Sequence, residues 1–174
     1  MRKISCILDS LLGGDLRSIG RANQIVATIG QDAGLFDEVF QGIFHDDPLI
    51  RMRSADVVEK VSCKYSFLLE KHKPVILASL DLFVQQEVKW HIALMLSYLE
   101  LSDEESELVF SKLSEWIKNE TSRIVIVNSI QALAAISMKH PELKQKTLKM
   151  IESQMMRGIP SIISRGKKLM KQLK

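Results

Sequence analysis

A helix–turn–helix unit recurs along this 174-residue chain, and the recurrence constrains its fold more than any other feature. In the second helix of each unit, one small or inward-facing position serves as an anchor. The anchors are Ala22, Ala55, Ala93, Val127 and Gly166, with Ser129 as an alternative to Val127. Consecutive anchors lie 33, 38, 34 and 39 residues apart, and an apolar residue follows each by three positions. A helical hairpin that returns at this period predicts an α-solenoid, in which each hairpin packs on its neighbours.

Proline turns and capping residues separate the expected helices. Asp47-Pro48, Lys73-Pro74 and His140-Pro141 each mark a helix start, and Ser102 with Glu105 has the spacing of a capping box. No stretch shows the alternation of a strand. We predict an all-α, right-handed superhelix of about five hairpins, with the second helices on its concave side. One domain, 1–174, then divides into approximate repeats 1–33, 34–70, 71–101, 102–140 and 141–174.

The stretch "DPLIRMRSA" resembles the turn and second helix of a HEAT repeat, in which Asp-Pro-x-Val-Arg precedes small residues. Asp47, Pro48, Ile50, Arg51 and Ala55 match this pattern. "EVKWHIA" is similar, with a lysine in place of the arginine, whereas the other repeats depart from the pattern and are supported mainly by their period. The resemblance implies a binding platform, although some HEAT-like proteins are enzymes.

His45, Asp46 and Asp47 stand side by side and have two interpretations. Metal-dependent phosphohydrolases of the His-Asp class use such residues as ligands, but adjacent residues do not converge on one ion without special backbone geometry. A carboxylate before a helix satisfies free backbone N–H groups and faces the positive end of the helix dipole. We therefore interpret this stretch as a turn and expect no metal site.

Basic residues stand four positions before the three middle anchors, whereas Ser18 and Ile162 take this place in the outer repeats. The basic residues are Arg51, Lys89 and Arg123. Equivalent positions of a solenoid stack on one another, so these cations should form a ladder. In HEAT-like repeats this residue usually bonds to neighbouring turns, and Asp47 and Glu87 are candidate partners. The alternative is a ridge on the concave face that attracts anions.

Charge is distributed unevenly toward the end of the chain. Residues 153–174 contain six cations, which include Lys167 and Lys168, and no acid. They form either the solvated face of a capping helix or a patch for phosphate or an acidic partner. No aromatic residue interrupts them, so base stacking is not indicated. "ELSDEESE" concentrates five carboxylates, which form either a solvated first turn or a patch for a basic partner.

These observations predict a non-enzymatic scaffold that binds another macromolecule, most simply a protein, with its concave face. The candidate partner-binding residues are Arg51, Lys89, Trp90, Arg123, Lys167 and Lys168, with Tyr98 as a further anchor. The alternative is a nucleic-acid-binding protein similar to the HEAT-like alkylpurine DNA glycosylases, which use concave Trp and Asp residues. No matching Trp–Asp constellation is visible in the sequence, and the net charge of +3 does not by itself imply nucleic acid.

The remaining features fit a cytoplasmic protein. Cys6 and Cys63 lie far apart and form no CxxC motif, as expected in a reducing compartment. "IVIVNSIQALAAISM" is too short and too polar to span a membrane and predicts a buried helix. We expect no cofactor and no catalytic residue, because neither a phosphate-binding loop nor a Ser–His–Asp arrangement is present. Oligomeric state does not follow from these patterns.

Overall fold

The structure, a computed structural model, describes residues 6–13, 20–30 and 32–173, and every regular element in these ranges is helical, as predicted. The helices are α1 (Cys6–Asp9), α2 (Ala22–Ile29), α3 (Leu35–Gln41), α4 (Pro48–Ser62), α5 (Phe67–Glu70), α6 (Lys73–Ala78), α7 (Gln86–Tyr98), α8 (Asp103–Asn119), α9 (Arg123–Lys139), α10 (Lys144–Met155) and α11 (Pro160–Leu173). The 3-10 helices η1 (Gly42–Phe44) and η2 (Pro141–Leu143) precede α4 and α10. None of the helices in these ranges combines the length and the apolar composition that crossing a membrane requires.

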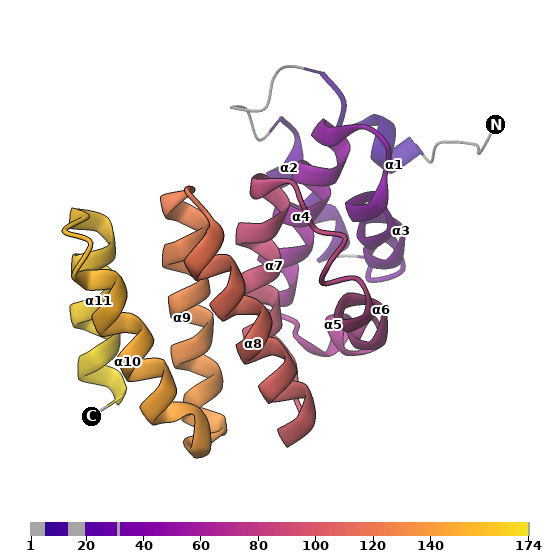
Figure 1. Ribbon diagram of the computed structural model, residues 1–174. Coiled ribbons are helices and arrows are strands. Elements are labelled where there is room, and N and C mark those ends of the chain that lie inside the picture. Colours follow the sequence, from indigo (N-terminus) through magenta and orange to yellow (C-terminus); the bar gives the residue numbers. More distant parts are fainter. Residues whose placement is uncertain (1–5, 14–19, 31, 174) are drawn as a thin grey trace.

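The helices pack in pairs, and the pairs pack on one another. Within pairs, α3 packs on α4, α8 on α9 and α10 on α11. Between pairs, α2 packs on α4, α4 on α7, α7 on α9 and α9 on α11. Figure 1 shows this succession across the molecule, from the indigo N-terminal helices to the yellow α11. We call α2, α4, α7, α9 and α11 the second helices, because they form a row in which each packs on the following one.

Local capping explains where two of the long helices begin, and both starts were predicted. The Asp47 carboxylate accepts hydrogen bonds from the backbone N–H groups of Leu49, at 2.8 Å, and Ile50, at 3.4 Å, and Pro48 is the first residue of α4. Ser102 and Glu105 form the reciprocal capping box of α8. Side chains thus satisfy backbone donors that have no partner within the helix.

In the third pair a helix begins at Lys73-Pro74 as predicted, but α6 ends at Ala78, and a separate short helix, α5, precedes it. α5 ends at Glu70 and α6 begins at Lys73. Pro74 has no N–H group to donate to the carbonyl of Glu70, so the α-helical hydrogen bonding cannot continue across this point. After α6, Phe83 is buried while Leu82 and Val84 are exposed.

Small residues let the helices approach closely at most anchors. Ala22, Ala55 and Ala93 have no exposed surface. A Cβ atom on Gly166 would lie 2.5 Å from the sulfur of Met155, so glycine permits the contact between α10 and α11. The anchor at Val127 is wrong, since Val127 is partly exposed. Ser129, two residues further on, is fully buried and occupies the inward position of α9.

Ion pairs join neighbouring helical pairs at a recurring sequence distance. Lys71 contacts Asp37, Lys73 contacts Glu105, Lys89 contacts Glu120, Lys112 contacts Asp81, Lys139 contacts Glu100, and Lys146 contacts Glu107. The partners of each pair lie 31 to 39 residues apart. Three of these contacts use carboxylates of the acidic run "ELSDEESE", which the protein's own lysines therefore partly neutralise.

Candidate interaction face

Each second helix leaves one side incompletely covered. On α7, partly exposed residues recur at helical spacing, whereas Val88, Ile92 and Leu96 on the opposite side are buried. We call the uncovered sides together the second-helix face. Its residues are Glu59 and Lys60 of α4, beside the buried Asp56; Trp90, His91, Leu94 and Tyr98 of α7; and Ile124, Val127, Asn128, Gln131 and Met138 of α9. On α11, the side opposite its buried residues carries Lys167, Lys168 and Lys171.

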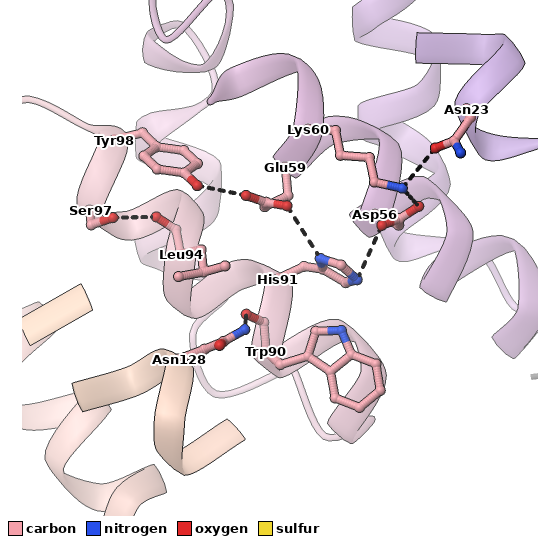
Figure 2. Close-up of polar contacts among 10 residues, drawn as sticks. All are labelled: Asn23, Asp56, Glu59, Lys60, Trp90, His91, Leu94, Ser97, Tyr98 and Asn128. Carbon is pink, nitrogen blue, oxygen red and sulfur yellow. Dashed lines mark hydrogen bonds and ion pairs between the residues drawn. The ribbon is translucent and has the colours of Figure 1, made fainter. Parts of the chain in front are cut away.

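At the α4 end of this face, His91 lies between two carboxylates of the neighbouring helix (Figure 2). Its Nε2 atom is 3.8 Å from Oδ1 of Asp56, and its Nδ1 atom is 3.8 Å from Oε2 of Glu59. Nδ1 is buried and has no hydrogen-bond partner, because 3.8 Å exceeds hydrogen-bonding distance. The imidazole therefore lies in an acidic setting without a close bond.

The same two carboxylates hold further groups. The Tyr98 hydroxyl donates to Oε1 of Glu59 at 2.6 Å, and the Lys60 ammonium contacts Oδ2 of Asp56 at 2.7 Å and the Asn23 carbonyl at 2.9 Å. Side chains of α2, α4 and α7 thus meet in one polar cluster (Figure 2). With His91 counted as neutral, the carboxylates of Asp56 and Glu59 and the ammonium of Lys60 give the cluster a formal charge of −1.

Burial and hydrogen bonding shift two pKa values in this cluster. Burial raises the pKa of Glu59, but the contacts with His91 and Tyr98 outweigh burial and bring the pKa below its ordinary value. Burial, followed by the bond to the Glu59 carboxylate, raises the pKa of Tyr98. Tyr98 is therefore a neutral donor to an ionised Glu59 at physiological pH, which is the arrangement of a charge-assisted hydrogen bond.

The middle of the face, on α9, is apolar and exposed. Ile124 is 51% exposed and Met138 is 59% exposed, and Val127 between them is partly exposed. Asn128 donates to the backbone carbonyl of Trp90 at 3.0 Å and so links α9 to α7. The prediction that the α9 stretch is a buried helix therefore holds for its inward side only. Ile124 and Met138 stand near opposite ends of α9, with the partly exposed Asn128 and Gln131 between them.

The cationic ladder serves mainly to join the pairs. Arg51 donates to the carbonyls of His45, at 2.9 Å, and Asp46, at 2.8 Å, and to the side chain of Gln85, at 2.9 Å. These partners, in the preceding turn and the following pair, replace Asp47 and Glu87, which were the wrong candidates.

The other two rungs of the ladder differ from each other. Lys89 bonds to Glu120 and lies 5.7 Å from the centre of the Trp116 ring. Arg123 is exposed and forms no ion pair with a described residue. Ser18, which takes the equivalent place in the first repeat, lies outside the described residues. Only Arg123 thus presents a cation available to a ligand.

The other candidate residues have different surroundings. Trp90 is partly buried and packs against the core, whereas Lys167 and Lys168 are exposed on α11. Tyr98 is partly exposed, with its hydroxyl engaged by Glu59. Trp90 and Tyr98 are therefore only partly accessible, whereas the α11 lysines present exposed charge.

Two histidine-containing clusters bear on metal binding. The Nδ1 atom of His45 accepts a hydrogen bond from the backbone N–H of Asp47 at 3.0 Å, so the side chain forms part of the turn. Asp103, His140 and Glu142 bring ligand atoms within 4.8 Å of one another. Asp103 is 93% exposed, however, and the His140 ring lies 3.3 Å from each carboxylate, an arrangement that an ion pair explains.

Sequence reasoning missed the polar cluster around His91. Asp56 and Glu59 lie three residues apart, and His91 and Tyr98 follow one repeat later. The repeat spacing that relates Ala55 to Ala93 also brings these side chains near each other, so the sequence did contain a signal for the cluster.

Comparisons with models of protein families, with curated proteins and with solved structures find no match for this chain.

Proposed function

We propose that the protein is a non-enzymatic, HEAT-like scaffold that binds another protein with its second-helix face. The observation that carries this proposal is the exposed apolar surface of α9, on which Ile124 and Met138 are more than half exposed between polar neighbours. Interfaces of this kind combine an apolar centre with a polar rim. Trp90 and Tyr98 are of the residue types that often dominate binding energy.

The solenoid part of the proposal is supported by long-range polar contacts. Besides the ion pairs, Arg51 contacts Gln85, Tyr98 contacts Glu59 and Asn128 contacts Trp90, at separations of 34, 39 and 38 residues. Contacts that return at one repeat length are expected where each hairpin touches its neighbours. A right-handed superhelix with the second helices inside remains part of the proposal.

A purification experiment with matched variants tests this function. The tagged protein and its Met138→Glu and Leu108→Glu variants are used to recover co-eluting proteins from the native host. Met138 is on the second-helix face, whereas Leu108 is on α8, and they have similar exposure, 59% and 51%. We expect the wild type and Leu108→Glu to retain a common partner that Met138→Glu loses. Equal recovery by all three proteins would contradict the proposal.

Nucleic-acid binding is the second candidate function, and Arg123, Lys167 and Lys168 favour it, since they are exposed and form no ion pair within the described part of the chain. Asp56 and Glu59 oppose it, because they place negative charge on the same face and interrupt any positive stripe. Fluorescence anisotropy of labelled DNA and RNA, single-stranded and duplex, at two salt concentrations distinguishes the candidates.

In this titration each phosphate contact that is lost should lower the log–log salt slope by about one unit. We expect negligible affinity at physiological salt. Tight binding that Arg123→Glu weakens would favour the nucleic-acid function. Arg123 is a better position for this test than Lys89, since Lys89→Glu would also break the ion pair with Glu120.

A further inference from the structure

The last helical pair carries a charge opposite to that of the rest of the chain. Residues 144–174 contain nine basic residues and one acidic residue, a formal charge of +8. Residues 1–143 contain fifteen basic and twenty acidic residues, a formal charge of −5. The mild net charge of the whole protein therefore conceals two regions of opposite sign.

The cations of α11 differ from most of the earlier lysines in what they contact. Before α10, Lys60, Lys71, Lys73, Lys89, Lys112 and Lys139 form ion pairs, whereas the exposed Lys64 and Lys118 form none with a described residue. On α10, Lys146 bonds to Glu107, but Lys149 and, on α11, Arg165, Lys167, Lys168 and Lys171 are exposed and form no ion pair with a described residue. Within the chain, lysines of one pair meet carboxylates of another. The exposed lysines of α11 have no such carboxylate partner among the described residues.

The second-helix face thus changes in character from one end to the other. The partly exposed Glu59 beside the buried Asp56 makes it acidic at α4, and the exposed Ile124 and Met138 make it apolar at α9. Beyond α9, the side of α11 opposite its buried residues carries exposed lysines. At helix spacings of about 8–10 Å, crossing from α4 to α11 takes about 24–30 Å, the length of a helix of about 20 residues.

Two features of the basic end favour a polypeptide over a nucleic acid. No Phe, Trp or Tyr follows Trp116 in the sequence, so α9 to α11 present no ring on which a base could stack. Methionines accompany the cations, with Met156 88% exposed beside Arg157 and Met170 partly exposed between Lys167 and Lys171. Methionine adapts to irregular apolar partners, which a phosphate backbone does not offer.

We propose that the second-helix face binds an amphipathic segment of a partner protein in one direction, with an acidic end on α11 and apolar side chains on α9. This inference rests on the proposed function and adds the chemistry and the polarity of the partner. The Lys–Glu contacts between pairs of this chain show the kind of bond expected on α11.

The test uses fluorescein-labelled probe peptides of about 20 residues, the length that spans the face. One is a helical peptide with leucines along one side and glutamates toward one end. A second has lysines in place of the glutamates, a third has the glutamates but no leucines, and a DNA duplex of similar length is the fourth probe. Anisotropy titrations of the whole protein are made at about 0.15 M ionic strength, where weak surface attractions are screened.

The decisive variant is Lys167→Glu/Lys168→Glu on α11. Its matched control is Lys64→Glu/Lys118→Glu, which reverses two exposed lysines that also lack ion pairs but lie outside the last pair. Lys168→Gln/Lys171→Gln removes charge without adding repulsion, and circular dichroism melts verify that each variant folds.

We expect the acidic amphipathic peptide to bind the wild type and the control alike, and to lose about tenfold in affinity for the α11 charge reversal, as two exposed charges should give. Equal binding to the α11 variants, or tighter binding of the lysine peptide, would overturn the proposal. Tighter binding of the duplex, abolished by the α11 reversal, would assign the basic end to nucleic acid and also overturn it. If the α11 charge reversal does not weaken peptide binding, the purification with Met138→Glu still tests separately whether the second-helix face binds a protein.

Discussion

Gly42 is a position at which a single methyl group should destabilise the protein, and the neighbouring Ser54 offers a way to relieve the effect. A Cβ atom on Gly42 would lie 2.1 Å from Oγ of Ser54, 3.0 Å from its Cβ and 2.8 Å from Cδ2 of Leu8. The end of the Leu8 side chain can move, whereas the Cβ of Ser54 is fixed by the backbone of α4. The close approach of η1 to α4 therefore requires glycine.

The magnitude follows from two opposing effects. Overpacking of a well-packed core costs about 1–3 kcal/mol, and a contact of 2.1 Å belongs at the upper end of this range. Alanine is favoured over glycine by about 1 kcal/mol in a helical conformation. We therefore expect Gly42→Ala to lower the free energy of unfolding by about 2 kcal/mol, or the melting temperature by about 4–8 °C for a chain of this size.

A double-mutant cycle with Ser54→Ala gives the test its control. Oγ of Ser54 is buried without a hydrogen-bond partner, so Ser54→Ala alone should be nearly neutral. In the double variant the 2.1 Å contact is gone, and urea unfolding should recover at least about 0.5 kcal/mol as a coupling energy.

Gly30→Ala makes the same chemical change at an exposed C-cap with φ of −59°, where the added Cβ would lie 3.3 Å from the backbone oxygen of Ala27, and should change the stability by no more than about 0.5 kcal/mol. Additive effects of Gly42→Ala and Ser54→Ala, or a Gly42→Ala protein as stable as the wild type, would refute the packing of η1 on α4.

Three further predictions concern the core and the polar cluster. Ala55→Leu should destabilise the protein by about 1–3 kcal/mol in thermal melts, since Ala55 is fully buried. The control Ala27→Leu, on the exposed side of α2, should change the melting temperature little. A wild-type melting temperature for Ala55→Leu would show that the anchor at Ala55 is misplaced. Tyr98→Phe leaves Glu59 without its hydroxyl donor and should lower the free energy of unfolding by about 1–3 kcal/mol, a loss that should vanish in a Glu59→Ala background, which has no acceptor, if the hydrogen bond is its cause. Because the folded-state pKa of Glu59 lies below its ordinary 4.5, its ionised form stabilises the fold above that pH, and this stabilisation is lost as the pH falls through the folded-state pKa. Urea unfolding across this acidic range should therefore show the cost of Glu59→Gln shrinking, and a cost independent of pH would contradict the shift.

The features that the sequence predicted well are those that depend on near neighbours. The cap of α4 at Asp47 and the capping box of α8 at Ser102 and Glu105 depend on residues within three positions. The buried alanines at 55 and 93 follow from helical spacing combined with a repeat period. Local periodicity and capping act before any long-range contact forms, so the sequence displays them directly.

The features that were missed depend on which side chain of one helical pair contacts which side chain of the following pair. Arg51 contacts Gln85 rather than Glu87, although both residues lie near the start of α7. The rotation of one helix against the other decides such a choice, and a single sequence does not reveal it. The same holds for His91, whose two carboxylate neighbours come from the preceding pair, and for the choice between Val127, which is partly exposed, and Ser129, which is buried.

Site-directed photo-crosslinking most directly tests whether the second-helix face is the binding surface. The photo-reactive amino acid p-benzoyl-phenylalanine replaces Met138 on α9 in one protein and Leu108 on α8 in another, two apolar side chains of comparable exposure. Both proteins are irradiated in extract of the native host, and adducts are resolved by mass. We expect position 138 to yield a discrete protein adduct that position 108 does not. Adducts at 108 alone, or a nucleic-acid adduct at 138, would contradict a protein-binding second-helix face.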